Sequence, residues 1–381
     1  MLNQIRKMIG GTYQPLNIVE ISKDNLLHNF KYLSSLHPKI KIAPVLKSNA
    51  YGHGLVEVAR VLDSIGPSGL QNDKSGRIPF FCVDSIYEAY ELLKIKIKTP
   101  ILIMGYIQPE NLKVKKLPFI FTVSTLDFAE AINKYQPNPK VHIFVDTGMH
   151  REGIPLNELP DFLDRIKKLN LKIEGLMSHL ASADNKNDPL NKLQVKNFEK
   201  ALRVLKNHKI NPKYCHLANS DCLIYSLPKF STNIARVGIS LFGIGSHNNL
   251  KPVLNFKTKI IQIKNLKKGD RVGYGGTFTA RKPMTIGVLP AGYYDGVDRR
   301  LSNKGWVTVD NIPCKIIGRV SMNITTIDIT KVTKVTIGQD VTIYSANPED
   351  LNSISNAAKI CETIPYDLLV HIAHSTKRKV V

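Results

Sequence analysis

The 381-residue chain has few cysteines, a single tryptophan and no long apolar run. Its five cysteines lie far apart and none has the spacing of a metal knuckle, which predicts a reducing compartment and no metal site. No segment approaches the ~20 apolar residues that a membrane span requires. The first residues include Arg6 and Lys7 but lack the apolar core of a secretory signal. These absences predict a cytoplasmic protein with no membrane segment.

Acidic residues are also scarce. The chain has 31 of them against 53 lysines and arginines, which gives a formal net charge of +22. Such a charge can indicate a nucleic-acid or anionic membrane partner. The basic residues are scattered, however, in short clusters at 113–116, 167–168 and 377–379, with no basic stripe between aromatic residues. We therefore expect a lysine-rich solvated surface that attracts small anions, and no nucleic-acid partner.

The first two thirds of the chain alternate short apolar runs with amphipathic stretches that have helical spacing. The runs begin at Ile42, Pro79, Ile101, Phe119, Val141, Ile173, Tyr214 and Asn233. Eight such strand–helix units predict a parallel (β/α)₈ barrel of the TIM type. A doubly wound open sheet is the alternative, and it is disfavoured because no glycine-rich dinucleotide loop follows the first strand.

After residue 250 the pattern changes to β-branched runs separated by turns. We therefore predict two domains, a barrel over residues 1–250 and a mostly-β domain over residues 251–381. A strand predicted at Leu16–Ile21 is a candidate to pair with the second domain. A segment rich in Gly, Ser and Asp, from Gly66 to Arg77, is predicted to be a surface loop.

Reactive and polar residues follow several of the predicted barrel strands. Active sites of such barrels form where the strands end, so these residues are expected to share one rim. They are Lys47, Arg151, His179, Asn219, Ser220, Arg236, Gly238 and Ile239. An amine, backbone N–H groups beside a glycine, and a group to face a ring nitrogen are what pyridoxal phosphate requires of a protein. The rim therefore predicts a site for that cofactor.

Nine ordered motifs extend this prediction over nearly the whole chain. They are VLKSNAYGHG at Lys47, DTGMHREG at Arg151, GLMSHLASAD at His179, HLANSDC at Ser220, ARVGISLFG at Arg236, RVGYGGTFTA at Tyr274, AGYYDGVDRRLSNKG at Tyr293, GRVSMN at Met322 and ETIPYDLL near Tyr366. With these motifs the chain resembles alanine racemases, which are fold-type III pyridoxal-phosphate enzymes. The resemblance implies a homodimer with shared active sites that interconverts L- and D-alanine for peptidoglycan synthesis.

The resemblance also implies roles for individual residues. Lys47 would hold the cofactor covalently and then act as one Cα base, and Tyr274 from the partner subunit would be the opposite base. Arg236 would face the pyridine nitrogen and keep it unprotonated, with His179 linking Arg236 to the tyrosine. The implied phosphate ligands are Tyr51, Ser220, Gly238 and Ile239. The implied substrate-side residues are Arg151, Met322 and Tyr293.

Three positions depart from the family pattern. Phe144 stands where many members have a lysine, often carbamylated, that positions the arginine corresponding to Arg151. Asn323 replaces the usual aspartate after Met322, and by count His374 stands where the family has a phosphate-binding tyrosine.

These departures leave other functions open. One is a racemase of serine, lysine or a broader set of amino acids, and another is a barrel that binds pyridoxal phosphate without catalysis. A decarboxylase of the same plan is disfavoured, because such enzymes place a carboxylate at the pyridine nitrogen.

Overall fold

The computed structural model describes residues 14–65, 78–225, 231–245 and 247–381. The surface loop predicted at Gly66–Arg77 lies outside these residues. The chain divides into two compact units. One unit comprises residues 24–251, and the other joins the N-terminal segment up to Lys23 to residues 252–381.

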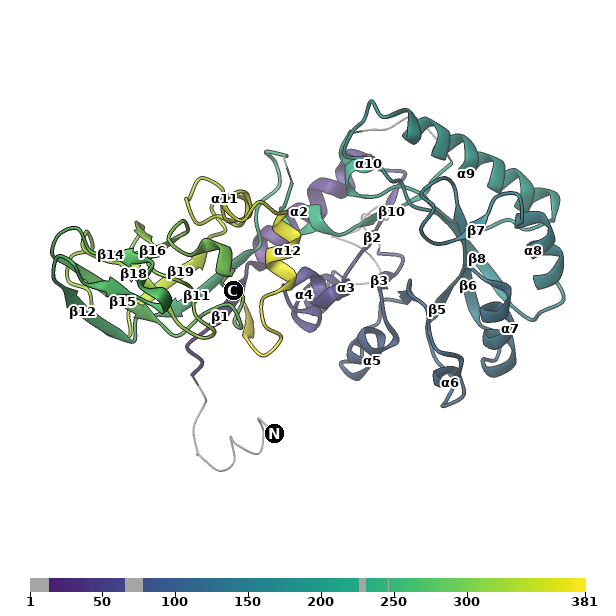
Figure 1. Ribbon diagram of the computed structural model, residues 1–381. Helices are drawn as coiled ribbons and strands as arrows, with labels where there is room; N and C mark the ends of the chain where they lie inside the picture. Colours follow the sequence, from purple (N-terminus) through teal and green to yellow (C-terminus); the bar gives the residue numbers. More distant parts are fainter. Residues whose placement is uncertain (1–13, 66–77, 226–230, 246) are drawn as a thin grey trace. The chain divides into compact units, whose positions relative to one another are not determined.

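The first unit is built around a ring of parallel strands (Figure 1). Within the described residues the ring strands are β2 (Lys41–Pro44), β3 (Phe81–Val83), β4 (Ile101–Ile103), β5 (Ile120–Val123), β6 (Lys140–Asp146), β8 (Lys172–Met177), β9 (Tyr214–His216) and β10 (Ile234–Val237). Strands β3 to β9 form one continuous ladder and β10 pairs with β2. Parallel bridges Val45–Cys82 and Ala218–Ala235 close the ring. The predicted (β/α)₈ barrel is confirmed, and a short β7 (Ile154–Pro155) adds to β6.

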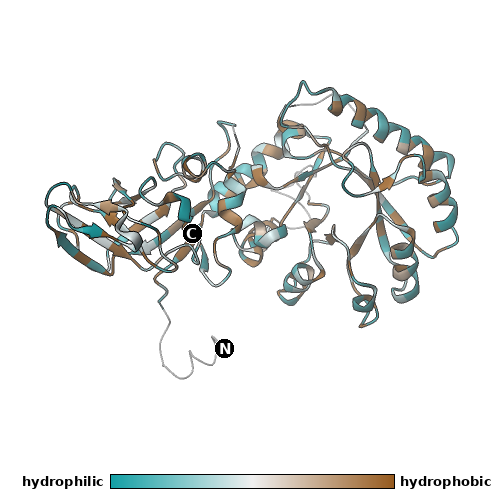
Figure 2. Ribbon diagram, viewed as in Figure 1, coloured by the Kyte–Doolittle hydropathy of each residue, from teal (hydrophilic) through white to brown (hydrophobic). Residues whose placement is uncertain are grey.

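One helix, α2, precedes the first ring strand, and the other helices follow ring strands on the outside of the ring (Figure 1). They are α2 (Lys23–Leu36), α3 (Lys47–Tyr51), α4 (Leu55–Asp63), α5 (Ile86–Lys94), α6 (Pro109–Leu112), α7 (Leu126–Tyr135), α8 (Leu159–Ile166), α9 (Pro189–Asn207) and α10 (Ser220–Tyr225), with a 3₁₀ turn η2 (Ile239–Phe242). Figure 2 shows apolar residues along the strands and on one side of the helices. In α8, for example, the buried residues are Leu159, Phe162, Leu163 and Ile166, which is the helical spacing expected from the sequence.

Side chains fill the interior of the ring. Apolar side chains from several strands, including Phe80, Cys82 and Leu102, form one buried cluster. Burying each large apolar side chain contributes roughly 1.5–3 kcal/mol, so this cluster is a main source of the barrel's stability. A histidine, His142, is also buried inside the ring, and Gly175 makes room for it because a Cβ there would lie 2.6 Å from the imidazole.

The second unit consists mainly of antiparallel sheets. Its strands are β1 (Ile18–Ile21), β11 (Leu254–Lys259), β12 (Gln262–Leu266), β13 (Arg271–Val272), β14 (Phe278–Thr279), β15 (Met284–Leu289), β16 (Trp306–Val309), β17 (Ile312–Lys315), β18 (Thr325–Asp328), β19 (Asp340–Tyr344) and β20 (Lys377–Val380). The largest sheet of this unit has the order β17-β16-β19-β11-β1-β20. The N-terminal strand β1 lies inside it, antiparallel to β11 and parallel to β20.

Two short helices interrupt the β structure near the C-terminus and were not predicted from the sequence. They are α11 (Ile354–Ile360) and α12 (Pro365–Val370), and 3₁₀ turns form at η3 (Tyr274–Gly276) and η4 (Arg299–Leu301). The start of α11 is fixed by the Ser353 hydroxyl, which accepts a hydrogen bond from the Asn356 N–H. Among the described residues, no helix combines the length and apolar character needed to cross a membrane.

Candidate active site

Lys47 follows shortly after β2, the first ring strand. The two residues before it are tied to both neighbouring strands, because the Val45 N–H donates to the Val237 carbonyl and the Leu46 N–H to the Cys82 carbonyl, both at 2.8 Å. Lys47 itself is half-buried. The amine is therefore attached at the carboxyl end of the barrel to a backbone that is fixed on both sides.

The four residues after Lys47 form a left-handed turn. Ser48, Asn49, Ala50 and Tyr51 have φ angles between 52° and 55°, and Gly52 follows at 83°. For residues with a Cβ this conformation costs roughly 1–2 kcal/mol each, so the surroundings must hold it in place. The Ala50 N–H donates to the Leu46 carbonyl at 2.8 Å, and the Leu55 N–H donates to Asn49 Oδ1 at 2.8 Å. The turn thus also caps α4.

Three of the four predicted phosphate ligands are brought together in contact, and the fourth follows in the chain. A Cβ at Gly238 would lie 2.5 Å from the Tyr51 hydroxyl, so only glycine fits. The Gly238 N–H donates to Ser220 Oγ at 3.3 Å, and Ile239 opens η2 directly afterwards. The hydroxyls of Tyr51 and Ser220 and the backbone of Gly238 therefore form a cradle, in which Tyr51 occupies the space that a side chain at position 238 would need.

Arg236 is buried at the end of the last ring strand. Its Nη1 donates to the His216 carbonyl at 2.5 Å and to His216 Nδ1 at 2.9 Å. Its Nη2 donates to the Ser178 carbonyl at 2.6 Å and to His179 Nδ1 at 3.0 Å. Burial lowers the pKa of Arg236 to about 10, which leaves it cationic at neutral pH.

These contacts fix the proton positions of three histidines. A guanidinium only donates, so Nδ1 of both His179 and His216 must accept, and each neutral ring then carries its proton on Nε2. His216 Nε2 lies 2.9 Å from His142 Nδ1 and donates to it. His142 Nε2 finds no hydrogen-bond partner within the described residues. Sequence reasoning missed His216 and His142, because a histidine in a buried strand resembles any other core residue.

The environment holds these histidines neutral. Burial, followed by repulsion from Arg236, lowers the pKa of His142 to about 3. Burial and the cations Arg236, Arg151 and Lys47 lower the pKa of His179 to about 3. Burial, then His142 and Arg236, lower the pKa of His216 well below its ordinary value. The cluster is therefore a set of neutral imidazoles around one buried cation.

We expect this cluster to make the protein sensitive to acid. Unfolded histidines titrate near 6.5, whereas these folded ones stay neutral down to about 3, so the unfolded chain binds more protons between those values. The free energy of unfolding should fall as pH drops from about 6.5, as measured by urea denaturation. In a His142→Phe variant the pH dependence should be less steep by about one proton per molecule. A free energy of unfolding that does not change between pH 7 and 5 would contradict the assignment.

Arg151 lies in the loop after β6. The Asp146 carboxylate fixes this loop by accepting hydrogen bonds from the N–H groups of Gly148, Met149 and His150 at 2.8, 3.0 and 3.2 Å. Arg151 Nε lies 3.3 Å from Glu152 Oε2, and both side chains are half-exposed. Phe144, by contrast, is buried in the barrel. The negative charge beside this arginine therefore comes from Glu152, because Phe144 carries none.

Tyr274 belongs to the second unit and is 72% exposed. It opens the turn η3, in which Gly275 and Gly276 have positive φ angles, as does Gly273 just before the turn. Arg271 holds this turn from behind, since its Nε donates to the Gly276 carbonyl at 3.1 Å and its Nη2 to the Gly275 carbonyl at 3.0 Å. The phenol is thus exposed to solvent on a turn that the Arg271 side chain holds in place.

Tyr293 and Met322 lie on two paired segments of the same unit. The Tyr293 N–H donates to the Ser321 carbonyl at 3.0 Å, and the Tyr294 N–H to the Met322 carbonyl at 2.9 Å. Both Tyr293 and Met322 are exposed. Asn323 Nδ2 donates to Asp295 Oδ2 at 3.2 Å, a bond that an aspartate at 323 could not make without a proton. The structure therefore brings these two predicted substrate-side residues together. His374 is exposed.

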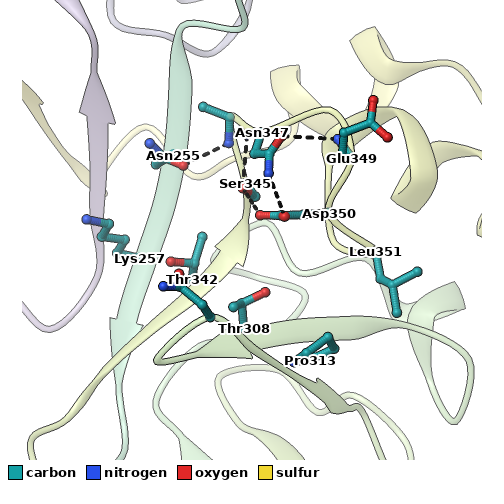
Figure 3. A pocket seen from close by; sticks show the side chains of 12 residues that line it. Asn255, Lys257, Thr308, Pro313, Thr342, Ser345, Asn347, Glu349, Asp350 and Leu351 are labelled. Carbon is teal, nitrogen blue, oxygen red and sulfur yellow. Dashed lines mark hydrogen bonds between the residues drawn. The ribbon is translucent and has the colours of Figure 1, made fainter.

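A separate polar pocket of about 600 Å³ lies in the second unit (Figure 3). Residues of β11, β19 and the 345–351 loop line it, and Ser345, Asn347 and Asp350 hydrogen-bond to one another there. None of the predicted site residues lines this pocket.

The chain therefore combines two features of one class of enzymes. It has a parallel barrel with a lysine, a glycine cradle and a buried arginine at its strand ends, and it has a mostly-β second unit. Two family models match the chain: the alanine racemase N-terminal domain over residues 21–246 and the alanine racemase C-terminal domain over residues 253–380. The chain belongs to the alanine racemase family.

Known relatives match nearly the whole chain. An alanine racemase of Borreliella burgdorferi is 36% identical, covering 94% of this chain and 95% of its own length. One of Syntrophobacter fumaroxidans is 34% identical over the same shares. The solved alanine racemase of Clostridium difficile 630 superposes with a TM-score of 0.87 at 28% identity, covering 97% of both chains.

Proposed function

We propose that the chain is a pyridoxal-phosphate-dependent alanine racemase that interconverts L- and D-alanine. The observation that carries the proposal is the rim of the barrel, where one amine, one glycine cradle and one buried arginine lie at strand ends. Family membership supports the same activity. In the cytoplasm of a bacterial cell, the product would supply peptidoglycan synthesis.

The residues present fit pyridoxal phosphate. The cradle of Tyr51, Ser220, Gly238 and Ile239 offers hydroxyl and N–H donors to a phosphate, and the missing Cβ of Gly238 lets the Tyr51 hydroxyl approach the backbone there. Lys47 supplies the amine for covalent attachment. When bound, the cofactor supplies the electron-withdrawing system that makes a substrate Cα–H acidic.

Arg236 is the residue proposed to face the pyridine nitrogen of the cofactor. It is fixed by two carbonyls and two imidazoles, and a guanidinium can only donate. Facing a ring nitrogen, it would keep that nitrogen unprotonated, which moderates the electron sink and favours racemisation over transamination. The neutral His179 keeps its Nε2–H as a donor beside this cation.

Racemisation requires one proton donor and one acceptor on opposite sides of the substrate Cα. Lys47 provides a base at the barrel rim. Tyr274 is the other candidate, and we propose that it comes from the partner subunit of a homodimer, because it is exposed on a rigid turn of the second unit. Arg151, Met322 and Tyr293 are the proposed contacts to the substrate and its entrance.

The decisive experiment is a solvent-deuterium exchange screen with the holoenzyme. Each enantiomer of alanine, serine and lysine is incubated in D₂O, and the Cα label and configuration of the product are read by chiral chromatography and mass spectrometry. Label in both enantiomers of alanine supports the proposal. Strong label only in serine or lysine would favour a racemase of that amino acid, which the Asn323 and Phe144 departures keep open. Cofactor binding without any exchange would indicate a non-catalytic barrel.

The shared site predicts that activity depends on protein concentration. Specific activity should fall on dilution in parallel with the dimer fraction measured by sedimentation, because a monomer would lack one of the two bases. Control samples are held for the same time at protein concentrations above the dissociation constant of the dimer. A fall in their activity would indicate loss of cofactor rather than dissociation. Full activity in a monomer would contradict the shared site.

A further inference from the structure

The left-handed turn after Lys47 is held by a residue from a different strand–helix unit. Glu88 lies in the first turn of α5, and its Oε1 accepts a hydrogen bond from the Asn49 N–H at 3.3 Å. Its other oxygen, Oε2, accepts from the Asp84 N–H at 2.9 Å and the Ser85 N–H at 3.3 Å. One carboxylate therefore joins the turn to the start of α5.

We propose that Glu88 is a positioning residue that holds the turn left-handed and thereby aims the Lys47 amine and the Tyr51 hydroxyl into the cofactor site. This inference rests on the proposed function. The Ala50 and Gly52 N–H groups donate to the nearby Leu46 and Ser48 carbonyls, whereas the Asn49 N–H donates to the Glu88 carboxylate, which belongs to a different strand–helix unit. Because each left-handed residue with a Cβ is strained, this external hydrogen bond helps to hold the turn.

The geometry explains why the direction of the turn matters. Lys47 precedes the left-handed residues and Tyr51 is the last of them, with its hydroxyl against Gly238. A turn that relaxed to right-handed φ angles would rotate Tyr51 away from the cradle and redirect the chain on both sides of Asn49. Asn49 also caps α4 through its side chain, so the Glu88 contact stabilises the exit from the turn as well.

A purely structural role for Glu88 must be separated from this one. Glu88 and Ser85 form a reciprocal capping box at α5, in which the Glu88 N–H donates to Ser85 Oγ at 3.2 Å. Replacing Ser85 by alanine removes that bond from the same helix start and leaves the Glu88 carboxylate in place. Ser85→Ala is therefore the matched control for lost capping.

The first measurement uses the cofactor-free full-length protein. Amide hydrogen exchange is followed by mass spectrometry in peptides that cover residues 46–55. In Glu88→Ala these amides should exchange about tenfold faster than in the wild type, because local opening becomes easier. In Ser85→Ala they should exchange at the wild-type rate. Equal exchange in the wild type and Glu88→Ala would overturn the proposal.

The second measurement is the affinity for pyridoxal phosphate, titrated by its visible absorbance. Loss of one hydrogen bond to a carboxylate corresponds to about tenfold weaker binding in Glu88→Ala. Ser85→Ala should bind within about twofold of the wild type, although both variants lower the thermal midpoint. Equal affinities in the two variants would overturn the proposal. If Glu88→Ala does not fold, Glu88→Asp keeps the charge but shortens the reach to Asn49, and the same two readouts apply.

The two measurements distinguish this inference from the proposed function. If the wild type does not bind pyridoxal phosphate, the proposed function fails, while the exchange experiment still decides whether Glu88 holds the turn. If the wild type binds the cofactor and Glu88→Ala shows neither change, only the role of Glu88 is refuted.

Discussion

A Lys47→Ala variant is expected to lose racemisation by about 10⁴-fold, together with the visible absorbance of the lysine-bound cofactor. The reason is that, in the proposed mechanism, the Lys47 amine performs two tasks, attachment of the cofactor and proton transfer at one side of the substrate. The backbone around position 47 is fixed by bonds from residues 45 and 46 to both neighbouring strands, so the fold should persist. The measurements are the racemisation rate, the absorbance spectrum and the circular dichroism of the same preparation.

Two control variants separate the loss of the amine from the loss of a positive charge. Lys47→Arg keeps the charge, but a guanidinium neither bonds covalently to the cofactor nor accepts a proton near neutral pH, so it should be as inactive as the alanine variant. Lys41→Ala removes an exposed lysine from the other end of the same strand and should retain wild-type activity. Substantial racemisation by Lys47→Arg would show that the amine is not the base.

The barrel could be predicted because its signal is local. Each ring strand is a short apolar run, and each run is followed by a segment with helical spacing, as at Leu159–Ile166. The two helices near the C-terminus could not be predicted in the same way. Both are short, and their segments are surrounded by strand-like runs, so only small signals such as the Ser353 cap and Pro365 mark their starts.

The site could be predicted only in part, for a comparable reason. Strand-end positions identify Lys47 and Arg236 as candidates, because the order of residues along a strand is visible in the sequence. The left-handed turn at 48–51 is not visible, since Ser48 and Ala50 have no preference for positive φ and only Asn49 and Gly52 favour it. The contact of Glu88 with this turn joins residues 39 positions apart and depends on the folded barrel.

The departures from the family pattern have different structural consequences. Phe144 is buried in the apolar interior and makes no ion pair. The carboxylate beside Arg151 is that of Glu152. Because this ion pair is half-exposed, it contributes at most about 1 kcal/mol, and the Asp146 hydrogen bonds do more to hold the loop. Asn323, in contrast, makes a new bond to Asp295, which supports the segment of Tyr293. The substitution at 323 therefore lies beside Tyr293 and Met322, which are proposed to contact the substrate.

A Tyr274→Phe variant is expected to lose racemisation by about 10²–10⁴-fold, with the larger loss in exchange of the L-alanine Cα proton. The change deletes one oxygen from a side chain that is 72% exposed, and the turn beneath it is held by Arg271 through backbone carbonyls. Stability and cofactor absorbance should therefore stay at wild-type values. In the proposed mechanism Lys47 remains as the base on the other side, so exchange of the D-alanine Cα proton should largely persist. Single-turnover exchange of each enantiomer in D₂O measures both rates.

Tyr294→Phe is the matched control, because Tyr294 is another exposed tyrosine of the same unit, at 60% exposure. It should exchange both enantiomers at rates within about twofold of the wild type, as expected for a surface substitution. Equal losses for the two enantiomers in Tyr274→Phe would mean that the phenol orders the site as a whole rather than serving one side of the substrate. Wild-type rates for both enantiomers would remove Tyr274 from the reaction and leave Lys47 as the single base, which would then have to reach both sides of the Cα.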